Sequence, residues 1–503
     1  MNFFAQRRAP QPERIPTDTV LPLPIWDDQQ FRRAICLHVT FRFDDVLDTR
    51  ALDLALCRLL EIGGWHRLGA RLRMNDNGKL EYHVPAQYSA QRPGIHYTVA
   101  KHSLRINEHP LAHKFPRAAG QPALLNCGKD IMSLCLAPDC PQQLEDWIYS
   151  DRPQLDIHAV TFSDATLLSV TFLHSLMDGI GLASFLKAWT DVLKGQEQQV
   201  PIFQGVGDDP LGQLTERTPA DKYVNSNLML RGCGLLIFII RYIFELIWYW
   251  NDRTHIICIP GHLVDELRTQ ALHEMADLKN EEHSTFLTED DVLLAWWTKA
   301  TIRALNPSRN RMVSLISMFN IRSVLLNGPL SENTAFITNT ILTSFTFLRC
   351  HHILQQPLSV IASRTRSALS QQRTQPQIEA LLAAQKVDLL KTGRPPLYGD
   401  SSCLMICCTN CHRCRFFDLD FSSAVISSSS TLSDRQKLSG RPTSVIPTYH
   451  LKEGFRLPNV GGIIGKDASG TWWLMWTLRK GAWPAIEQEL NGLVNKTGSS
   501  DRQ

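Results

Sequence analysis

Strand-like alternation and helical periodicity are interspersed along the whole chain, without a regular strand–helix–strand rhythm. Ala34 to Phe43 and Thr166 to Phe172 are rich in β-branched and aromatic residues, whereas Asp48 to Ile62 carries leucines at helical spacing. A doubly wound parallel sheet would require strands and helices to alternate regularly. The pattern therefore predicts a mixed α+β fold, in which mixed sheets pack against helices.

The length of the chain indicates two domains. At 503 residues it exceeds what one compact core usually holds. Composition changes between Leu193 and Asn251, where a polar run and Gly/Asp/Pro punctuation precede a long apolar stretch. We interpret residues 206–253 as a crossover between an N-terminal half, residues 1–205, and a C-terminal half, residues 254–503.

The C-terminal half has its own boundary signals. Thr288-Glu-Asp-Asp291 precedes Val292 to Leu305 and is typical of a capping box, in which the threonine and the acid satisfy two free backbone donors. Thr254 to Ile259 and Thr471 to Leu478 predict strands. A final helix should then reach about Leu493.

Charge and cysteine content exclude some classes of protein. The 52 basic and 49 acidic residues give a net charge of +3, so a nucleic-acid partner is not expected. The thirteen cysteines are odd in number and irregularly spaced, unlike those of a disulfide-stapled secreted domain. The first residues lack the apolar core of a signal peptide. We expect a cytoplasmic protein.

One apolar stretch, Gly232 to Trp250, has about the length of a membrane span. Its uninterrupted apolar run before Arg241 is only nine residues long, and Glu245 is placed i,i+4 so that it can pair with that arginine. The stretch therefore predicts a buried or membrane-surface helix and not a span. Aromatic residues cluster at 248–250, as they do at interfaces, so a weak contact with a membrane surface stays open.

The candidate catalytic residue is His174, in the segment Phe172-Leu-His-Ser-Leu-Met-Asp178-Gly179. It ends an apolar strand, and a helix with an apolar stripe follows the glycine. Such a junction presents a side chain rigidly, and an imidazole can exchange a proton near neutral pH. A buried structural histidine is the other interpretation, and the residues alone leave both open.

Spacing by itself is weak evidence, because the chain contains a second His-x-x-x-Asp. His273 and Asp277 lie in a charged helical pattern over residues 262–280. There an i,i+4 pair is most simply a solvated helix face.

The segment 173–179 resembles the catalytic motif of the BAHD acyltransferases, in particular the fungal branch with the trichothecene O-acetyltransferases. Further segments follow in the family's order: Asn320-Ile-Arg322 with Asn339, then Asp418-Leu-Asp420-Phe421, then the closing strand and helix from Thr471. The resemblance extends from Leu21-Pro-Leu-Pro to near the end of the chain.

This resemblance implies two similar chloramphenicol-acetyltransferase-like domains with an active-site channel between them. The protein would be a monomer that binds no permanent cofactor and no metal. Acyl-CoA, with acetyl-CoA as the expected donor, would be a co-substrate, and the acceptor would be a hydroxyl group of a small secondary metabolite.

The resemblance also implies roles for single residues. His174 would act as the general base for direct attack of the acceptor on the thioester, without an acyl-enzyme. Asp178 would point away from substrate and pair with Arg322. Asn339 would help to orient the same loop, and Gly179 would supply the small residue that the turn needs.

Two segments depart from the family pattern. Ser422-Ser-Ala424 replaces Gly-Trp-Gly after Asp420-Phe421, but because the acid is retained we carry Asp420 as a third catalytic position.

The run from Cys403 to Cys414 superficially resembles a metal-binding sequence. A closed metal site needs a second pair of ligands, so a buried strand is the preferred interpretation.

Two alternatives remain. A condensation-type domain, which forms N-acyl bonds, usually has a doubled histidine, whereas Leu173 precedes His174 here. A non-catalytic, membrane-surface homologue of the same fold would account for the altered Asp420 segment and for the apolar helix.

Overall fold

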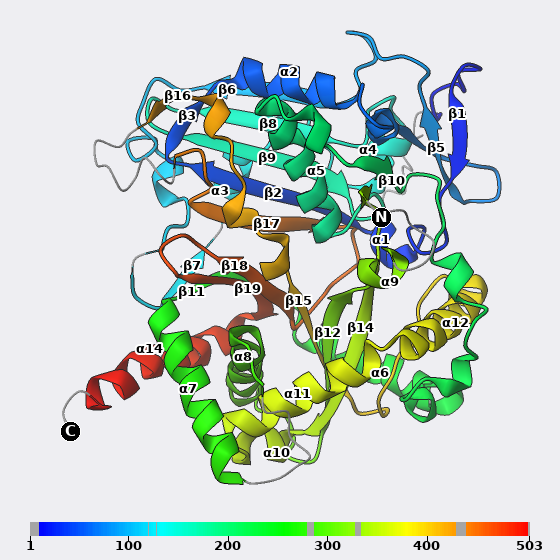
Figure 1. The fold of residues 1–503 in the computed structure, drawn as a ribbon. Helices are drawn as coiled ribbons and strands as arrows, with labels where there is room; N and C mark the ends of the chain where they lie inside the picture. Colours follow the sequence, from blue (N-terminus) through cyan, green and yellow to red (C-terminus); the bar gives the residue numbers. More distant parts are fainter. Residues whose placement is uncertain are drawn as a thin grey trace, which may run out of the picture.

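The computed structural model describes residues 10–118, 120–126, 128–278, 286–326, 333–428 and 439–500. Two large sheets form its framework, one above the other in Figure 1. The upper, five-stranded sheet has the order β17 (Ser444–Leu451), β2 (Ile35–Phe43), β9 (Thr166–Leu173), β8 (Asp156–Thr161), β6 (His96–Lys101). The strands predicted around residues 34–43 and 166–172 are therefore neighbouring inner strands of this sheet, β2 and the central β9.

The lower sheet has seven strands. Their order is β14 (Ile341–Arg349), β12 (Met312–Asn320), β15 (Leu404–Asn410), β18 (Val460–Lys466), β19 (Trp472–Arg479), β11 (Asp252–Ile259), β7 (Ala123–Asn126). Parallel pairs, β6–β8 and β12–β15–β18, occur beside antiparallel ones. The prediction of mixed sheets is confirmed.

Each large sheet contains one strand from the other half of the chain. β17 pairs with β2 in the upper sheet, with Val445 opposite Phe41, and is the orange strand beside the blue one in Figure 1. β7 pairs with β11 in the lower sheet, with Leu125 opposite Ile256. The boundaries at residues 205 and 253 stay predictions, since the sheets do not divide the chain at a single point.

Helices cover both sheets. On the upper sheet α2 (Thr49–Leu59) packs against α5 (Gly179–Leu193), and Trp189 of α5 donates a hydrogen bond to the Leu52 carbonyl at 3.1 Å. On the lower sheet α8 (Glu289–Leu305) packs against α7 (Gly261–Leu278), α11 (Leu358–Gln372) and α14 (Trp483–Ser500). The capping box at Thr288 is present as predicted, with both reciprocal hydrogen bonds to Asp291.

Shorter elements complete the fold. The strands are β1 (Thr19–Pro22), β3 (Asp45–Leu47), β4 (Arg71–Met74), β5 (Leu80–Val84), β10 (Ile202–Gln204), β13 (Thr334–Phe336) and β16 (Val425–Ser428). The helices are α1 (Gln30–Arg33), α3 (Lys129–Cys135), α4 (Leu144–Ile148), α6 (Gly232–Trp248), α9 (Arg322–Leu326), α10 (Cys350–Gln355) and α12 (Gln375–Thr392). β10 pairs in parallel with β13, where the chain begins to cross between the halves.

The apolar stretch of the sequence forms α6. Among the described residues, no helix is both long enough and apolar enough to cross a bilayer. The predicted pairing of Glu245 with Arg241 is wrong, because Glu245 is half-buried against the lower sheet and forms its ion pair there with Arg311, at 2.7 Å.

Candidate active site

His174 follows the last residue of β9, a strand that is buried along its whole length. Its backbone N–H donates to the Ile35 carbonyl at 3.0 Å and so extends the pairing of β9 with β2 by one residue. The Leu176 N–H then donates to the Leu173 carbonyl at 2.9 Å and turns the chain toward α5. The backbone of His174 is therefore fixed to the end of an inner strand of the upper sheet.

Asp178 joins this loop to the C-terminal half of the chain. It is 2% exposed, and it caps α5 by accepting a hydrogen bond from the Gly181 N–H at 2.9 Å. Arg322 donates to both carboxylate oxygens, at 2.9 and 3.0 Å, and the Thr340 N–H donates to Oδ2 at 3.0 Å. A bidentate pair of this kind fixes direction as well as distance. The carboxylate is fully occupied in holding the loop.

Arg322 in turn holds the segment that approaches the histidine. Its guanidinium donates to the carbonyls of Phe336 at 2.7 Å and Thr338 at 2.8 Å. Asn339, between the two anchored residues Thr338 and Thr340, donates through Nδ2 to the His174 carbonyl at 2.8 Å. The structure thus brings His174, Asp178, Arg322 and Asn339 together, although they come from both halves of the chain.

Two further residues of this cluster, Asp27 and Arg32, were not identified from the sequence. Asp27 is buried and accepts hydrogen bonds from the backbone and side-chain nitrogens of Asn339, at 3.2 and 2.7 Å. Arg32 Nη1 lies 3.5 Å from Asp27 Oδ1. The sequence feature that could have identified Asp27 is its position directly after Trp26, in the apolar segment that begins at Leu21.

Burial sets the electrostatics of the cluster. It raises the pKa of Asp27 to about 7, with a smaller contribution from Asp178 in the same direction, against the opposing effects of Arg32 and Asn339. Burial and the Arg32 charge lower the pKa of His174 to about 4, although the backbone carbonyls of His174 and Met177 oppose the shift. The imidazole is therefore neutral at pH 7.

Only one edge of the imidazole is available. Nδ1 is buried and makes no hydrogen bond of ordinary geometry with any described residue. The side chain as a whole is half-buried, which leaves Nε2 as the ring nitrogen open to a substrate. A neutral imidazole with an accessible Nε2 can accept a proton from a hydroxyl group.

Comparisons with known proteins identify the family. No protein-family model matches the chain. Acetyltransferase adrJ of Penicillium rubens is 40% identical over 503 residues, which cover 99% of this chain and 100% of adrJ. O-acyltransferase pboC of Aspergillus ustus is 38% identical over 455 residues, 90% of this chain and 94% of pboC. The chain belongs to the fungal BAHD-type acyltransferases.

Solved structures agree with this assignment at the level of the fold. F. graminearum TRI101, complexed with coenzyme A and T-2 mycotoxin, matches with a TM-score of 0.66 at 13% identity, over 93% of this chain and 97% of that one. Vinorine synthase matches with a TM-score of 0.57 at 15% identity, over 97% and 95% of the two chains.

One relative from Penicillium decumbens, 35% identical over 97% of this chain and 98% of its own, is named transcriptional regulator calD.

Two glycines shape the His174 loop of the acyltransferase, because a side chain at either position would approach neighbouring atoms closely. Gly179 is the first residue of α5, where a Cβ would lie 3.3 Å from Cys414 Sγ, a tight contact that a shift of the cysteine side chain by a few tenths of an ångström would relieve. A Cβ at Gly181 would lie 1.9 Å from the Ile337 carbonyl oxygen, which is backbone. Gly181, which the sequence analysis did not single out, is thus the more constrained position.

Asp420 does not join the His174 cluster. It pairs with Lys194 at 2.7 Å, and Lys194 follows the last residue of α5, about 22 Å along the helix from its first turn. Burial raises the pKa of Asp420, but hydrogen bonds from Lys194 and Ser422 outweigh it and bring the pKa to about 2. The neighbouring Phe421 packs edge-on against Trp189 of α5, with ring centroids 5.4 Å apart. The contacts of this segment support α5 at its far end.

The second His-x-x-x-Asp lies outside the site. His273 and Asp277 are both exposed on α7, as the helical pattern predicted. Of the cysteine run, only Cys407 and Cys408 lie in strand β15 (Leu404–Asn410), whereas Cys403 precedes it and Cys411 and Cys414 follow it. The twelve described cysteines of the chain are free thiols.

Proposed function

We propose that the acyltransferase moves an acetyl group from acetyl-CoA to a hydroxyl group of a small secondary metabolite, with His174 as the general base. The observation that carries this proposal is the double anchoring of the His174 loop, by the Asp178–Arg322 pair and by Asn339 on the His174 carbonyl. A structural histidine would not need such support from both halves of the chain. The acetyltransferase and O-acyltransferase relatives support the same chemistry.

The reaction is a direct acyl transfer. The acceptor oxygen attacks the thioester carbonyl carbon while Nε2 of His174 takes the hydroxyl proton, and the carbon–sulfur bond then breaks. The proton returns from the imidazolium to the leaving thiolate, so the products are an ester and free CoA. Because the pKa of His174 is only about 4, we expect proton transfer to accompany attack, as the attacking oxygen becomes more acidic.

A basic pocket beside the loop suits the phosphate groups of CoA. It has a volume of about 260 Å³, and its lining includes Arg413, Arg415 and Lys466. Arg415 is neutralised by Asp418 at 2.8 Å, whereas Arg413 is exposed and Lys466 is half-buried. The pocket adjoins the catalytic loop, because Cys414, next to Arg413, packs against Gly179. Lys466→Gln should therefore raise KM for acetyl-CoA with little change in kcat.

The setting of the enzyme is part of the proposal. We expect a monomer in the cytoplasm, and the free described cysteines suit a reducing compartment. The T-2 mycotoxin in the TRI101 complex suggests that the acceptor is a bulky, hydroxyl-bearing molecule.

The decisive experiment replaces the base. His174→Ala should lower kcat by about 10²–10⁴-fold, with unchanged thermal unfolding and unchanged binding of CoA. His273→Ala, in the exposed second motif, is the matched control and should keep full activity. Retention of activity by His174→Ala on a verified acceptor would refute the mechanism.

A non-catalytic role is the competing proposal, and the relative named as a transcriptional regulator is the observation that favours it. The two differ in a simple assay, in which the wild-type protein is incubated with acetyl-CoA and an extract of its host. Acetylated products that depend on His174 support the enzyme. CoA binding without any turnover would favour the non-catalytic role.

A further inference from the structure

The outward face of α6 is apolar, whereas the outward face of a surface helix is usually polar. Eight of its apolar side chains are 37–69% exposed, and two aromatic residues that follow the helix are 44% and 74% exposed. They are Leu236, Ile237, Ile239, Ile240, Ile243, Phe244, Ile247, Trp248, Tyr249 and Trp250. Ten such side chains present on the order of 1,000 Å², whereas patches beyond a few hundred Å² mark interaction sites.

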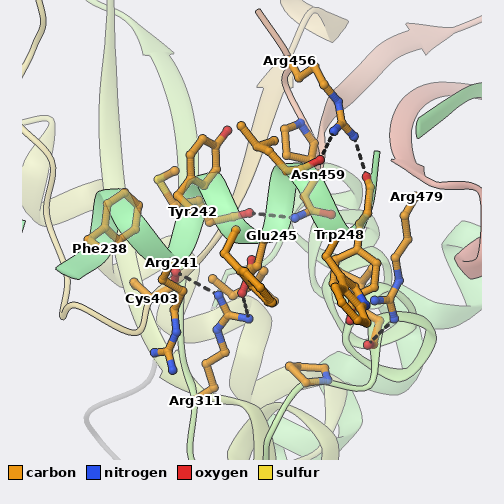
Figure 2. A pocket seen from close by; sticks show the side chains of 18 of the residues that line it. Phe238, Arg241, Tyr242, Glu245, Trp248, Arg311, Cys403, Arg456, Asn459 and Arg479 are labelled. Carbon is orange, nitrogen blue, oxygen red and sulfur yellow. Dashed lines mark hydrogen bonds and ion pairs between the residues drawn. The ribbon is translucent and has the colours of Figure 1, made fainter. Parts of the chain in front are cut away.

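The polar contacts of this helix lie on its inner side. Figure 2 shows the cavity of about 420 Å³ between α6 and the lower sheet, where Glu245 pairs with Arg311 at 2.7 Å. Arg456 pairs there with Asp252 and donates to the carbonyl oxygens of Leu246 and Tyr249. These ion pairs and hydrogen bonds fix the orientation of α6 about its own axis. Its apolar side therefore faces outward.

The shape of the exposed face favours a fluid partner. At about 100° per residue, the exposed apolar positions of the helix cover an arc of about 180°, from Ile239 through Ile247 to Trp248. A second helix, including α6 of another copy, would cover only a stripe of roughly 100°. A bilayer surface can surround the whole half-cylinder.

The charges at the edge of the arc identify the kind of surface. Arg241 is exposed just beyond Trp248 on the helical wheel, Arg231 is exposed at the N-cap, and Arg253 is exposed beyond the C-terminal end. Every residue of α6 is described, and its one acidic side chain, Glu245, points inward. Arginines at the border can reach anionic headgroups, and aromatic residues such as Trp250 are typical of the interfacial layer.

We propose that α6 docks on the surface of an anionic lipid bilayer, with its outward half in the interfacial layer and its flanking arginines against the phosphate headgroups. This contact goes beyond acyl transfer, because none of these residues belongs to the His174 cluster. An enzyme held at a membrane would meet apolar acceptors where they concentrate.

The test uses flotation of the full-length protein with vesicles of phosphatidylcholine and phosphatidylserine in a ratio of about 7:3. Ile247→Asp places a charge at the centre of the arc and should weaken binding by at least about tenfold. Leu390→Asp is the matched control, because Leu390 is also 69% exposed and also helical, on α12, and it should bind like the wild type. Arg241→Gln should weaken binding to the anionic vesicles, and about 0.5 M salt should do the same.

Failure of the wild type to float with these vesicles would overturn the proposal. So would equal loss of binding in Ile247→Asp and Leu390→Asp. Sedimentation velocity without vesicles should find a monomer, and a dimer that Ile247→Asp dissociates would assign the face to a second copy instead. Acetylation of a water-soluble acceptor should be unchanged in Ile247→Asp, so failure of the docking and failure of the proposed chemistry give different results.

Discussion

Asp178→Asn should weaken folding and catalysis together. The Asp178 carboxylate accepts hydrogen bonds from Gly181, Thr340 and both terminal nitrogens of Arg322. Asparagine retains one acceptor oxygen, but its amide group would place a donor against the donors of Arg322. The loop would lose its fixed direction, and the buried arginine would lose its counter-charge.

The size of the effect follows from these contacts. Breaking a buried ion pair by removing one partner costs about 3–5 kcal/mol. Arg322 keeps the carbonyls of Phe336 and Thr338 as acceptors, so we expect the lower end of that range, about 3 kcal/mol. A loop displaced by about 1 Å can cost up to about 10²-fold in rate. The loss should appear in kcat, with KM for acetyl-CoA nearly unchanged.

Urea unfolding and steady-state kinetics measure the two effects on the same preparation. Asp191→Asn is the control, because Asp191 lies on the same helix, is 3% exposed and pairs with Lys187 at 2.7 Å. Lys187 is 65% exposed, so that pair should be worth only about 1 kcal/mol, and activity should stay intact.

Two results would refute this reasoning. Unchanged stability with a lower kcat in Asp178→Asn would mean that the carboxylate acts on the reaction directly. Equal loss of stability in Asp178→Asn and Asp191→Asn would mean that the pair with Arg322 is no stronger than a surface pair.

Other expectations test the remaining features. Because the pKa of His174 is lowered to about 4, kcat/KM should stay level as the pH falls to about 5. It should drop only near pH 4, where the imidazole of the free enzyme becomes protonated, and a drop centred near pH 6.5 would contradict the pKa shift. Gly181→Ala should prevent recovery of folded protein, whereas Gly179→Ala should fold and retain activity, as thermal unfolding and rate assays would reveal; equal behaviour of the two would count against the packing argument. Asp420→Asn removes one half-exposed ion pair and should cost at most about 1 kcal/mol in urea unfolding, with kcat preserved; a large loss of kcat would restore a catalytic role.

Local features of the fold could be predicted from the sequence because their signals are local. The alternation in residues 34–43 and 166–172 and the capping box at Thr288 each depend on neighbours a few positions apart. The contact between Asp27 and Asn339 joins residues 312 positions apart, and no periodicity encodes it. The separation of Asp420 from the His174 cluster could not be predicted for the same reason, since the order of motifs along a chain does not give their distance in space.

The site residues fall into the same two groups. His174 could be proposed from its strand end and the following helix, and Arg322 only from a family resemblance. Glu245 pairs with Arg311, which only the tertiary fold brings close, whereas the sequence indicated only Arg241, four positions away. That pairing depends on how α6 packs against the lower sheet, which the local sequence does not encode.

Strand β17, which comes from the C-terminal half but completes the upper sheet, also constrains how the enzyme folds during translation. During translation β2 is synthesised about 400 residues before β17, its partner at the edge of the upper sheet. At roughly 5–20 residues per second, this interval lasts about 20–80 s. Throughout that time the growing upper sheet has an open edge, a state that favours pairing with other chains. The anchors of the His174 loop are synthesised in the same interval, so no partial chain that ends before Thr340 carries all the residues of the site. Protection of that edge during translation, and not the final stability of the enzyme, should limit its yield in a foreign host.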